Sequence, residues 1–361
     1  MSAAATGPLD FTSALYLGLR HPGCALDGWD ALTLGKPAAL QDVPGAREVA
    51  AALARLQGCA AATLLPSTLH LFWDLFGMLG RERFALLVDG AAYPVARWGA
   101  ERATGLGLPL RTFGHGDVAG LERLALAWHD SGRRPLILAD GYSPGAAQAP
   151  PLAAYAAVAQ RHGGLLLLDD TQALGLLGRH GGGSARRHGI AGMPVLVGAS
   201  LAKAFGVPLA VLAGGAAWVR RFERVSDTRL HASPPSQAVV AAARRALRIN
   251  AVCGDALRRT LAQRVAQFRA AAQGAGLPCD GGAFPVQSVT LPAGADLAAA
   301  HAALCHAGVL ALPQYRAGRA RLTFLLRADH APTDVARAAQ VLARVVTRAK
   351  VHELKELREL T

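Results

Sequence analysis

Long apolar runs alternate with amphipathic stretches between about residue 48 and residue 215, and this pattern constrains the fold most strongly. The runs are apolar at consecutive positions, which is typical of strands buried on both faces in a parallel sheet between two helix layers. We predict strands at residues 84–88, 136–138, 165–168, 195–197 and 209–213. We predict helices between them, among others at residues 48–56, 121–129 and 153–161. The sequence therefore predicts an α/β fold with a mostly parallel central sheet.

The rest of the chain predicts a second, smaller α/β domain. A long Ala- and Arg-rich helical region at residues 235–275 precedes a set of shorter elements. These are strands at residues 285–291, 309–312 and 319–327 and helices at residues 296–307 and 333–348. A length of 361 residues also favours two domains over one. The predicted parts are an N-terminal segment joining the small domain (1–45), a large domain (46–235), a connecting helix (236–275) and a small C-terminal domain (276–361).

The composition predicts a globular protein of the cytoplasm. Hydrophobic residues make up 52% of the chain and charged residues 17%, which excludes a disordered protein. The first eleven residues lack the basic and apolar regions of a secretory signal, and the apolar runs are too short to cross a membrane. The cysteines are odd in number and lack metal-ligand spacing, so we expect reduced thiols and no metal. They are Cys24, Cys59, Cys253, Cys279 and Cys305.

The chain carries a formal charge of +13 and has a pI near 10.4. Its arginines are dispersed, and no basic motif interleaved with aromatic residues is present, so we expect no nucleic-acid partner. Two explanations of the excess charge stay open at this point. It favours an anionic substrate such as a phosphate-bearing coenzyme, or it reflects a genome that encodes Arg wherever a cation is needed.

Lys203 stands out because the chain uses Arg at almost every other cationic position. The remaining lysines are Lys36, Lys350 and Lys355, so Lys203 is the only one between residues 37 and 349. Arg stays protonated and forms no imine, whereas a Lys amine can lose its proton and attack a carbonyl group. The neighbours of Lys203 are apolar, and burying an unpaired ammonium group among them is costly, which argues against an incidental surface lysine. This pattern indicates a covalent role for Lys203.

Asp169 follows the predicted strand at residues 165–168, at the edge where open α/β sheets bind ligands. A carboxylate at this edge suits a protonated pyridine nitrogen, whose ring then acts as an electron sink. The glycine-rich stretch between Asp169 and Lys203 favours a close approach to a cofactor. Together the two residues point to pyridoxal 5'-phosphate bound as a Schiff base to Lys203, while a helix cap and a surface cation are the alternatives.

Four segments resemble the α-oxoamine synthase family of fold-type-I pyridoxal-phosphate enzymes. They are LDFTSALYLGLRHP (9–22), DDTQALGLLGRHGGGS (169–184), SLAKAFGV (200–207) and ARLTFLLRADH (320–330), in the order in which that family has them. The resemblance covers nearly the whole chain, and the lysine segment is the most specific. It implies a large domain with a mostly parallel sheet and a smaller α/β domain.

The resemblance also implies roles for individual residues. Lys203 matches the Schiff-base lysine, and Asp169 matches the partner of the pyridine nitrogen. Ser200 takes the place of a hydroxyl that contacts the cofactor phosphate. Ser67 and Thr68 align with the turn that cradles this phosphate at a helix start.

Other positions depart from the family pattern. Tyr93 and Gln172 stand where the family has a histidine over the pyridine ring and a histidine near the ring hydroxyl. His231 lies where the neighbouring subunit contacts the cofactor phosphate, which implies a homodimer with shared active sites. Thr323 replaces the arginine that pairs with the substrate carboxylate, and a neutral hydroxyl cannot make that bidentate contact. The candidates to supply the charge are Arg321, Arg327 and Arg316, and Arg321 lies on the same side of the predicted strand as Thr323.

The resemblance implies a decarboxylative acyl transfer from acyl-CoA or an acyl-carrier protein to an amino acid. The departures at Thr323 and Gln172 leave a second hypothesis open, in which the protein is an aminotransferase or decarboxylase for an atypical amine substrate. A third hypothesis is a non-catalytic homologue, which the presence of both Lys203 and Asp169 disfavours.

Overall fold

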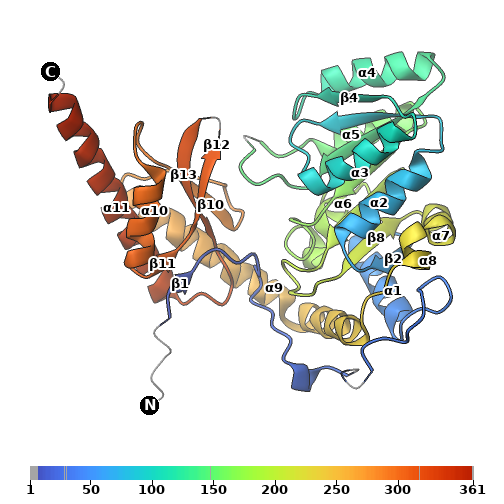
Figure 1. The fold of residues 1–361 in the computed structure, drawn as a ribbon, viewed down its shortest axis with the longest axis horizontal. Helices are drawn as coiled ribbons and strands as arrows, with labels where there is room; N and C mark the ends of the chain where they lie inside the picture. The colour runs from blue at the N-terminus through green and yellow to red at the C-terminus, as the bar shows by residue number, and fades with distance from the viewer. Residues whose placement is uncertain (1–6, 28, 30, 147, 317, 360–361) are drawn as a thin grey trace. The chain divides into compact units, whose positions relative to one another are not determined.

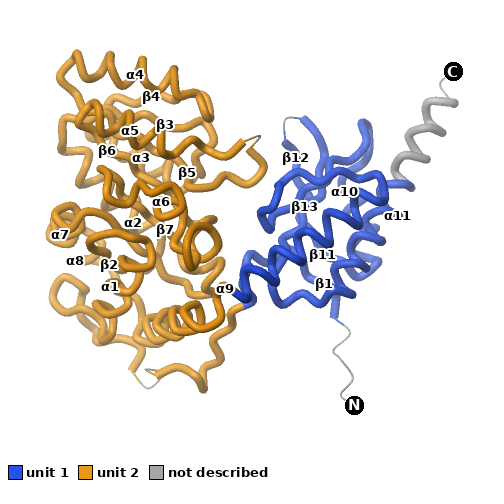
Figure 2. The backbone as a smooth tube through the Cα atoms, turned by 180° about the vertical axis from the view of Figure 1, so that it is seen from behind, with its two compact units in different colours: residues 1–18, 256–361 blue, residues 19–255 orange. Residues whose placement is uncertain are grey.

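The computed structural model describes residues 7–27, 29, 31–146, 148–316 and 318–359, and side chains as far as residue 347. The chain divides into two compact units, which Figure 2 shows in different colours. Unit 1 comprises Met1–Gly18 and Ala256–Thr361, and unit 2 comprises Leu19–Asp255. Residues 19–45 therefore belong to the larger unit, and the long helix α9 (Gln237–Gly274) belongs to both.

Unit 2 is built on a seven-stranded sheet (Figure 1). Its strand order is β2 (Ala61–Leu65), β8 (Ala210–Gly214), β7 (Val195–Ser200), β6 (Leu165–Asp169), β5 (Arg134–Asp140), β3 (Phe84–Asp89) and β4 (Leu110–Phe113). Strands β7, β6, β5, β3 and β4 run parallel, and β8 is antiparallel to both of its neighbours. The predicted α/β fold with a mostly parallel central sheet is confirmed.

Helices cover both faces of this sheet, which explains why its central strands are apolar at consecutive positions. Neighbouring residues of one strand enter different cores: Leu167 belongs to one hydrophobic cluster and Leu168 to the other. Helices α2, α3 and α7 contribute to the first cluster, and α4, α5 and α6 to the second. The helices of unit 2 are α1 (Ala46–Gln57), α2 (Thr68–Leu79), α3 (Pro94–Gly105), α4 (Val118–Asp130), α5 (Leu152–Arg161), α6 (Gly183–Arg187), α7 (Ala216–Val225) and α8 (Asp227–His231).

Unit 1 has its own four-stranded antiparallel sheet, in the order β12 (Leu312–Arg316), β13 (Arg319–Leu325), β10 (Val286–Thr290) and β9 (Cys279–Asp280). A parallel pair joins β1 (Leu9–Asp10) to β11 (Val309–Leu310), so the N-terminal segment packs with the C-terminal part of the chain. Two further helices, α10 (Leu297–His306) and α11 (Pro332–Glu359), complete the unit. None of the described helices is both long and apolar enough to span a membrane.

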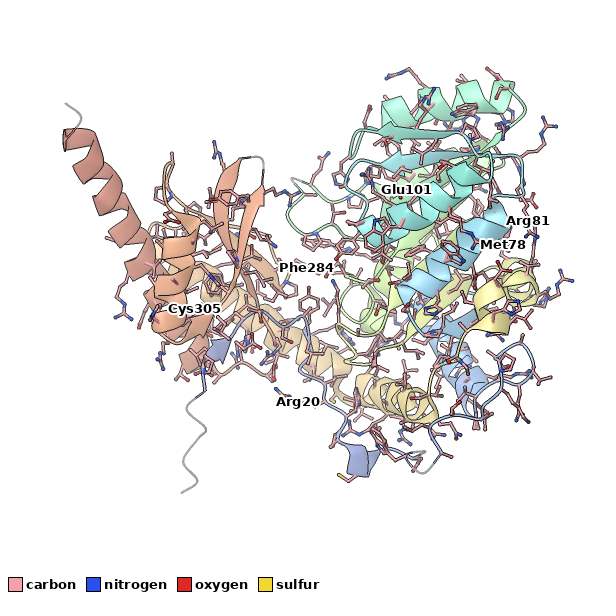
Figure 3. The ribbon with its side chains drawn as sticks, viewed as in Figure 1. Arg20, Met78, Arg81, Glu101, Phe284 and Cys305 are labelled. Atoms are coloured by element: carbon pink, nitrogen blue, oxygen red, sulfur yellow. The ribbon has the colours of Figure 1, made fainter. Side chains whose placement is uncertain are left out.

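Helices α2 and α3 cross closely at Gly99. In Figure 3 the buried Met78 marks α2 and the exposed Glu101 marks α3. A Cβ atom at Gly99 would lie 2.6 Å from Cδ2 of Phe76 and 2.9 Å from both Cβ and the carbonyl oxygen of Phe72. The crossing distance of the two helices therefore depends on the absence of a side chain at this position.

We predict that Gly99→Ala lowers the free energy of unfolding by about 1–3 kcal/mol, because the added methyl group overpacks the helix crossing. Gly105→Ala is the matched control, since it lies in the same helix and a new Cβ atom there would lie within 4 Å of no described residue outside its chain neighbours and its own helix backbone. Urea unfolding followed by circular dichroism measures both variants. A Gly99→Ala protein as stable as the Gly105→Ala protein would contradict this packing.

Asp170, which directly follows β6, is connected through Ser184 at the start of α6 to Gly141, which directly follows β5. One of its oxygens, Oδ2, accepts the Ser184 N–H at 2.9 Å, and the Ser184 hydroxyl donates to the Gly141 carbonyl oxygen at 3.0 Å. The other oxygen, Oδ1, is buried without a hydrogen-bond partner among the described residues. Burial, followed by the nearby Asp169 carboxylate, raises the pKa of Asp170 to about 7 against the opposing effect of the Ser184 hydrogen bonds.

This raised pKa predicts that part of the folding stability is lost as the pH rises. Between an ordinary pKa of 3.8 and about 7, the unfolded state has an ionised Asp170 while the folded state keeps the proton, so unfolding releases a proton. When the pH is raised from 5 to 8, the free energy of unfolding of the wild type should therefore fall. In Asp170→Asn, which lacks this titrating group, the fall should be smaller by about 1–3 kcal/mol. Urea unfolding at both pH values measures this difference, with the exposed Asp130→Asn as control. Equal pH dependence in wild type and Asp170→Asn would contradict the prediction.

Candidate active site

A pocket of about 220 Å³ in unit 2 lies at the carboxyl ends of β5 and β6 and at the N-termini of α2 and α3. This is the sheet edge at which open α/β folds bind ligands. Its lining residues are Thr68, Tyr93, Val95, Asp140, Tyr142, Pro144, Asp169, Thr171, Gln172, Ser200 and Lys203. The structure thus brings together six of the residues that the sequence analysis selected. These are Lys203, Asp169, Tyr93, Gln172, Ser200 and Thr68.

Lys203 lies in the turn between β7 and β8 and is partly buried. Burial lowers the pKa of its amine below the ordinary value of 10.5, while the carboxylates of Asp169 and Asp140 act in the opposite direction. A lower pKa increases the share of free amine, which is the form that attacks a carbonyl group. The environment of Lys203 therefore suits a nucleophile and a proton acceptor.

Asp169 ends β6 and is buried. Its Oδ1 atom accepts the backbone N–H of Thr171 at 3.0 Å, two residues further along the chain. Burial raises the pKa of Asp169, and the Thr171 hydrogen bonds and the charge of Lys203 oppose this shift. A buried carboxyl group of this kind gains most from a cationic partner, such as a protonated ring nitrogen.

Asp140 is a pocket residue that the sequence analysis missed. It ends β5 and is the direct register partner of Asp169 on β6. Leu138 and Leu167, two residues earlier on each strand, lie in the same hydrophobic cluster, so the two carboxyl groups share one face of the sheet. The sequence does place an acidic residue, Asp140, shortly after a predicted buried strand. Its pairing with Asp169 could not be predicted, because it depends on the order of the strands in the sheet.

Hydroxyl groups and the start of helix α2 provide uncharged polar groups in and beside the pocket. The Ser67 hydroxyl caps α2, where it accepts the His70 N–H at 3.4 Å, and Thr68 is the pocket residue of this pair. Ser200 donates its backbone N–H to the Thr171 hydroxyl at 3.0 Å, and its own hydroxyl accepts the Ala202 N–H at 3.2 Å. The free N–H groups of a helix N-terminus attract an anion such as a phosphate group.

Tyr93 and Gln172 line the same pocket from two different loops. Tyr93 precedes α3, and the residue is 56% exposed although its backbone N–H donates to Asp140 Oδ1 at 3.1 Å. An exposed aromatic face beside a pocket is available for stacking on a planar ring. Gln172 follows Thr171 after β6 and presents an amide that can donate or accept a hydrogen bond.

The predicted residues His231, Thr323 and Arg321 are not among the residues that line this pocket. His231 is an exposed residue at the end of α8 and does not belong to the pocket lining. Thr323 belongs to the sheet of unit 1 and is 2% exposed, with its hydroxyl 2.7 Å from that of Ser288 and donating to Gln314 Oε1 at 3.1 Å. Arg321, on the same sheet, forms an ion pair with Asp280. The cofactor role of His231 and the substrate roles of Thr323 and Arg321 stay predictions.

Comparison with known proteins identifies the family. A family model described as aminotransferase class I and II matches residues 38–342. An 8-amino-7-oxononanoate synthase from Geobacter sulfurreducens is 30% identical over 352 residues, which is 91% of this chain and 86% of that protein. Another from Alkalilimnicola ehrlichii is 33% identical over 272 residues, which is 74% of this chain and 66% of that protein.

The fold is similar to that of a solved Sphingomonas wittichii serine palmitoyltransferase. The TM-score is 0.83 at 18% sequence identity, over 94% of this chain and 88% of that chain. The pocket itself fits pyridoxal phosphate, because it combines one primary amine, a buried carboxyl group, an exposed aromatic ring and a helix N-terminus. The chain therefore belongs to the class I and II aminotransferase family, and within it to the pyridoxal-phosphate-dependent α-oxoamine synthases.

Proposed function

We propose that this protein transfers an acyl group from a thioester to an amino acid with loss of carbon dioxide. A bond forms between the α-carbon of the amino acid and the acyl carbon, the thiol leaves, and the carboxylate departs as carbon dioxide to give an aminoketone. The placement of Lys203 and Asp169 in one pocket carries the cofactor chemistry of this proposal. The curated relatives named 8-amino-7-oxononanoate synthase support it.

Each pocket residue has a role in this proposal. Bound pyridoxal phosphate supplies the electron sink for the charge that develops on the α-carbon. Lys203 would be the covalent attachment point, and its amine, whose pKa is lowered by burial, would accept the α-proton. Asp169 would pair with the protonated pyridine nitrogen. Ser200, Thr68 and the N-terminus of α2 would hold the phosphate group.

A second function keeps the same pocket with a different substrate. Thr323 is neutral and already bonded to Ser288 and Gln314, and Arg321 is paired with Asp280. These contacts favour a substrate that needs no carboxylate clamp from this sheet. An aminotransferase or a decarboxylase acting on an atypical amine is therefore the second candidate.

The proposal extends to partners, assembly and location. The amino substrate is an amino acid, and the acyl donor is acyl-CoA or an acyl-carrier protein, in the cytoplasm. Large apolar side chains are exposed on α2, α3 and α8, namely Leu69, Trp73, Trp98 and Leu230. A homodimer would cover such side chains and would allow His231 of one subunit to approach the active site of the other.

We expect the purified protein, loaded with pyridoxal phosphate, to release free thiol and carbon dioxide when an amino acid and an acyl-CoA are both present. Lys203→Arg should lower this rate by about three orders of magnitude or more, because guanidinium neither forms the covalent link nor accepts the proton. Lys36→Arg is the matched control, since Lys36 is an exposed lysine that binds Gln41. Thiol titration and labelled carbon dioxide measure the reaction.

Two outcomes would contradict acyl transfer. Formation of a keto acid or loss of carbon dioxide without any acyl-CoA would support the second candidate instead. An unchanged rate in Lys203→Arg would contradict the role of Lys203 in either reaction.

A further inference from the structure

Asp140 brings a second carboxyl group into a pocket where one carboxylate is enough to hold a pyridine nitrogen. It lies beside Asp169 in the strand register, on the same face of the sheet, and both residues line the pocket. Two neighbouring carboxyl groups in a buried site do not both ionise readily, because each negative charge disfavours the other. One of the pair is therefore expected to keep a proton near neutral pH.

The positive charge of Lys203 acts more strongly on Asp169 than on Asp140, so Asp140 is the carboxyl group of the pair that keeps the proton. Strand β6 places Asp169 beside Asp140. Strand β3 contributes Asp89, whose side chain binds Tyr155 and His115 on the opposite face of the sheet. Two described residues near Asp140 can carry a positive charge: Lys203, after β7, and His115, which follows β4 and is bound to Asp89 at 2.8 Å. Burial, then the charge of Asp169, raises the pKa of Asp140 to about 7.

The hydrogen bonds of Asp140 are compatible with a neutral acid. Its Oδ1 atom accepts the backbone N–H of Tyr93 at 3.1 Å, which a carbonyl oxygen does as well as a carboxylate. Its Oδ2 atom lies 3.3 Å from the Ser143 hydroxyl, and this oxygen can accept from the serine or, when protonated, donate to it. Both bonds thus persist when the acid carries its proton.

We propose that Asp140 is a positioning residue of the cofactor site. It keeps its own proton, so that Asp169 carries the negative charge of the pair, and it holds Tyr93 in place by accepting its backbone N–H. This inference rests on the proposed function, because it assigns Asp169 to the pyridine nitrogen and Tyr93 to the ring face. The charge that faces the ring nitrogen is then a single negative charge. The start of α3 is held at the pocket by the same residue.

The protonation of Asp140 is tested on the protein without cofactor. Infrared difference spectra between about pH 5 and pH 8.5, with isotope-labelled aspartate, report the carbonyl band of protonated aspartic acid. We expect Asp140→Asn to remove part of this band, and Asp170→Asn, whose residue lies outside the pocket lining, to remove another part. Asp169→Asn should move the titration of Asp140 to lower pH, because the neighbouring charge is removed. A band unchanged in Asp140→Asn would overturn the proposal.

The positioning role is tested by cofactor affinity. At pH 6.5, we expect Asp140→Asn to bind pyridoxal phosphate within about threefold of the wild type, because the amide oxygen still accepts the Tyr93 N–H. Asp140→Ala should bind it about tenfold more weakly, because that acceptor is lost. Absorbance titration gives both dissociation constants, and circular dichroism verifies that the variants fold.

The outcomes separate this inference from the proposed function. An Asp140→Asn protein that binds as weakly as Asp140→Ala would show that a negative charge is required, which overturns the neutral acid. An Asp140→Ala protein that binds as tightly as the wild type would overturn the positioning role. If the wild type itself bound no pyridoxal phosphate, the proposed function would fail together with this inference, whereas the first two outcomes leave the proposed function intact.

Discussion

The burial of acidic groups at one edge of the parallel sheet is the constraint on which the rest of the site depends. Parallel strands end together, so β5 and β6 deliver Asp140 and Asp169 to the same place. Charged forms of these groups are costly in a buried site unless a cation or a hydrogen-bond donor compensates them. The amine of Lys203 partly compensates them, and a protonated ring nitrogen would add a cation.

The packing of the same sheet sets the position of one side of the site. Two hydrophobic clusters hold the strands from both faces, and the close crossing at Gly99 fixes α2 against α3. The N-termini of these two helices then lie beside the strand ends and carry Thr68 and Tyr93. An anion site and a ring-stacking site thus follow from the packing of the helices rather than from the loops alone.

The central sheet could be predicted because consecutive apolar residues are typical of strands buried on both faces. Lys203 and Asp169 could be selected from their residue types and from the residues around them in the sequence. The sequence missed β2, a short Ala-rich edge strand, and β12, whose residues are mostly exposed and include a proline. The sequence did not single out Asp140, because its proximity to Asp169 follows from the strand register and the two residues are 29 positions apart in the chain. The hydrogen bonds that engage Thr323 could not be predicted either, because they depend on the pairing of three strands.

The covalent attachment of the cofactor to Lys203 is the central claim, and borohydride reduction tests it most directly. The purified protein loaded with pyridoxal phosphate should show a visible absorption band that borohydride removes. Peptide mass mapping should then find the pyridoxyl adduct on the peptide that contains Lys203, and not on the one that contains Lys36. No visible band, or an adduct only at another lysine, would contradict the account.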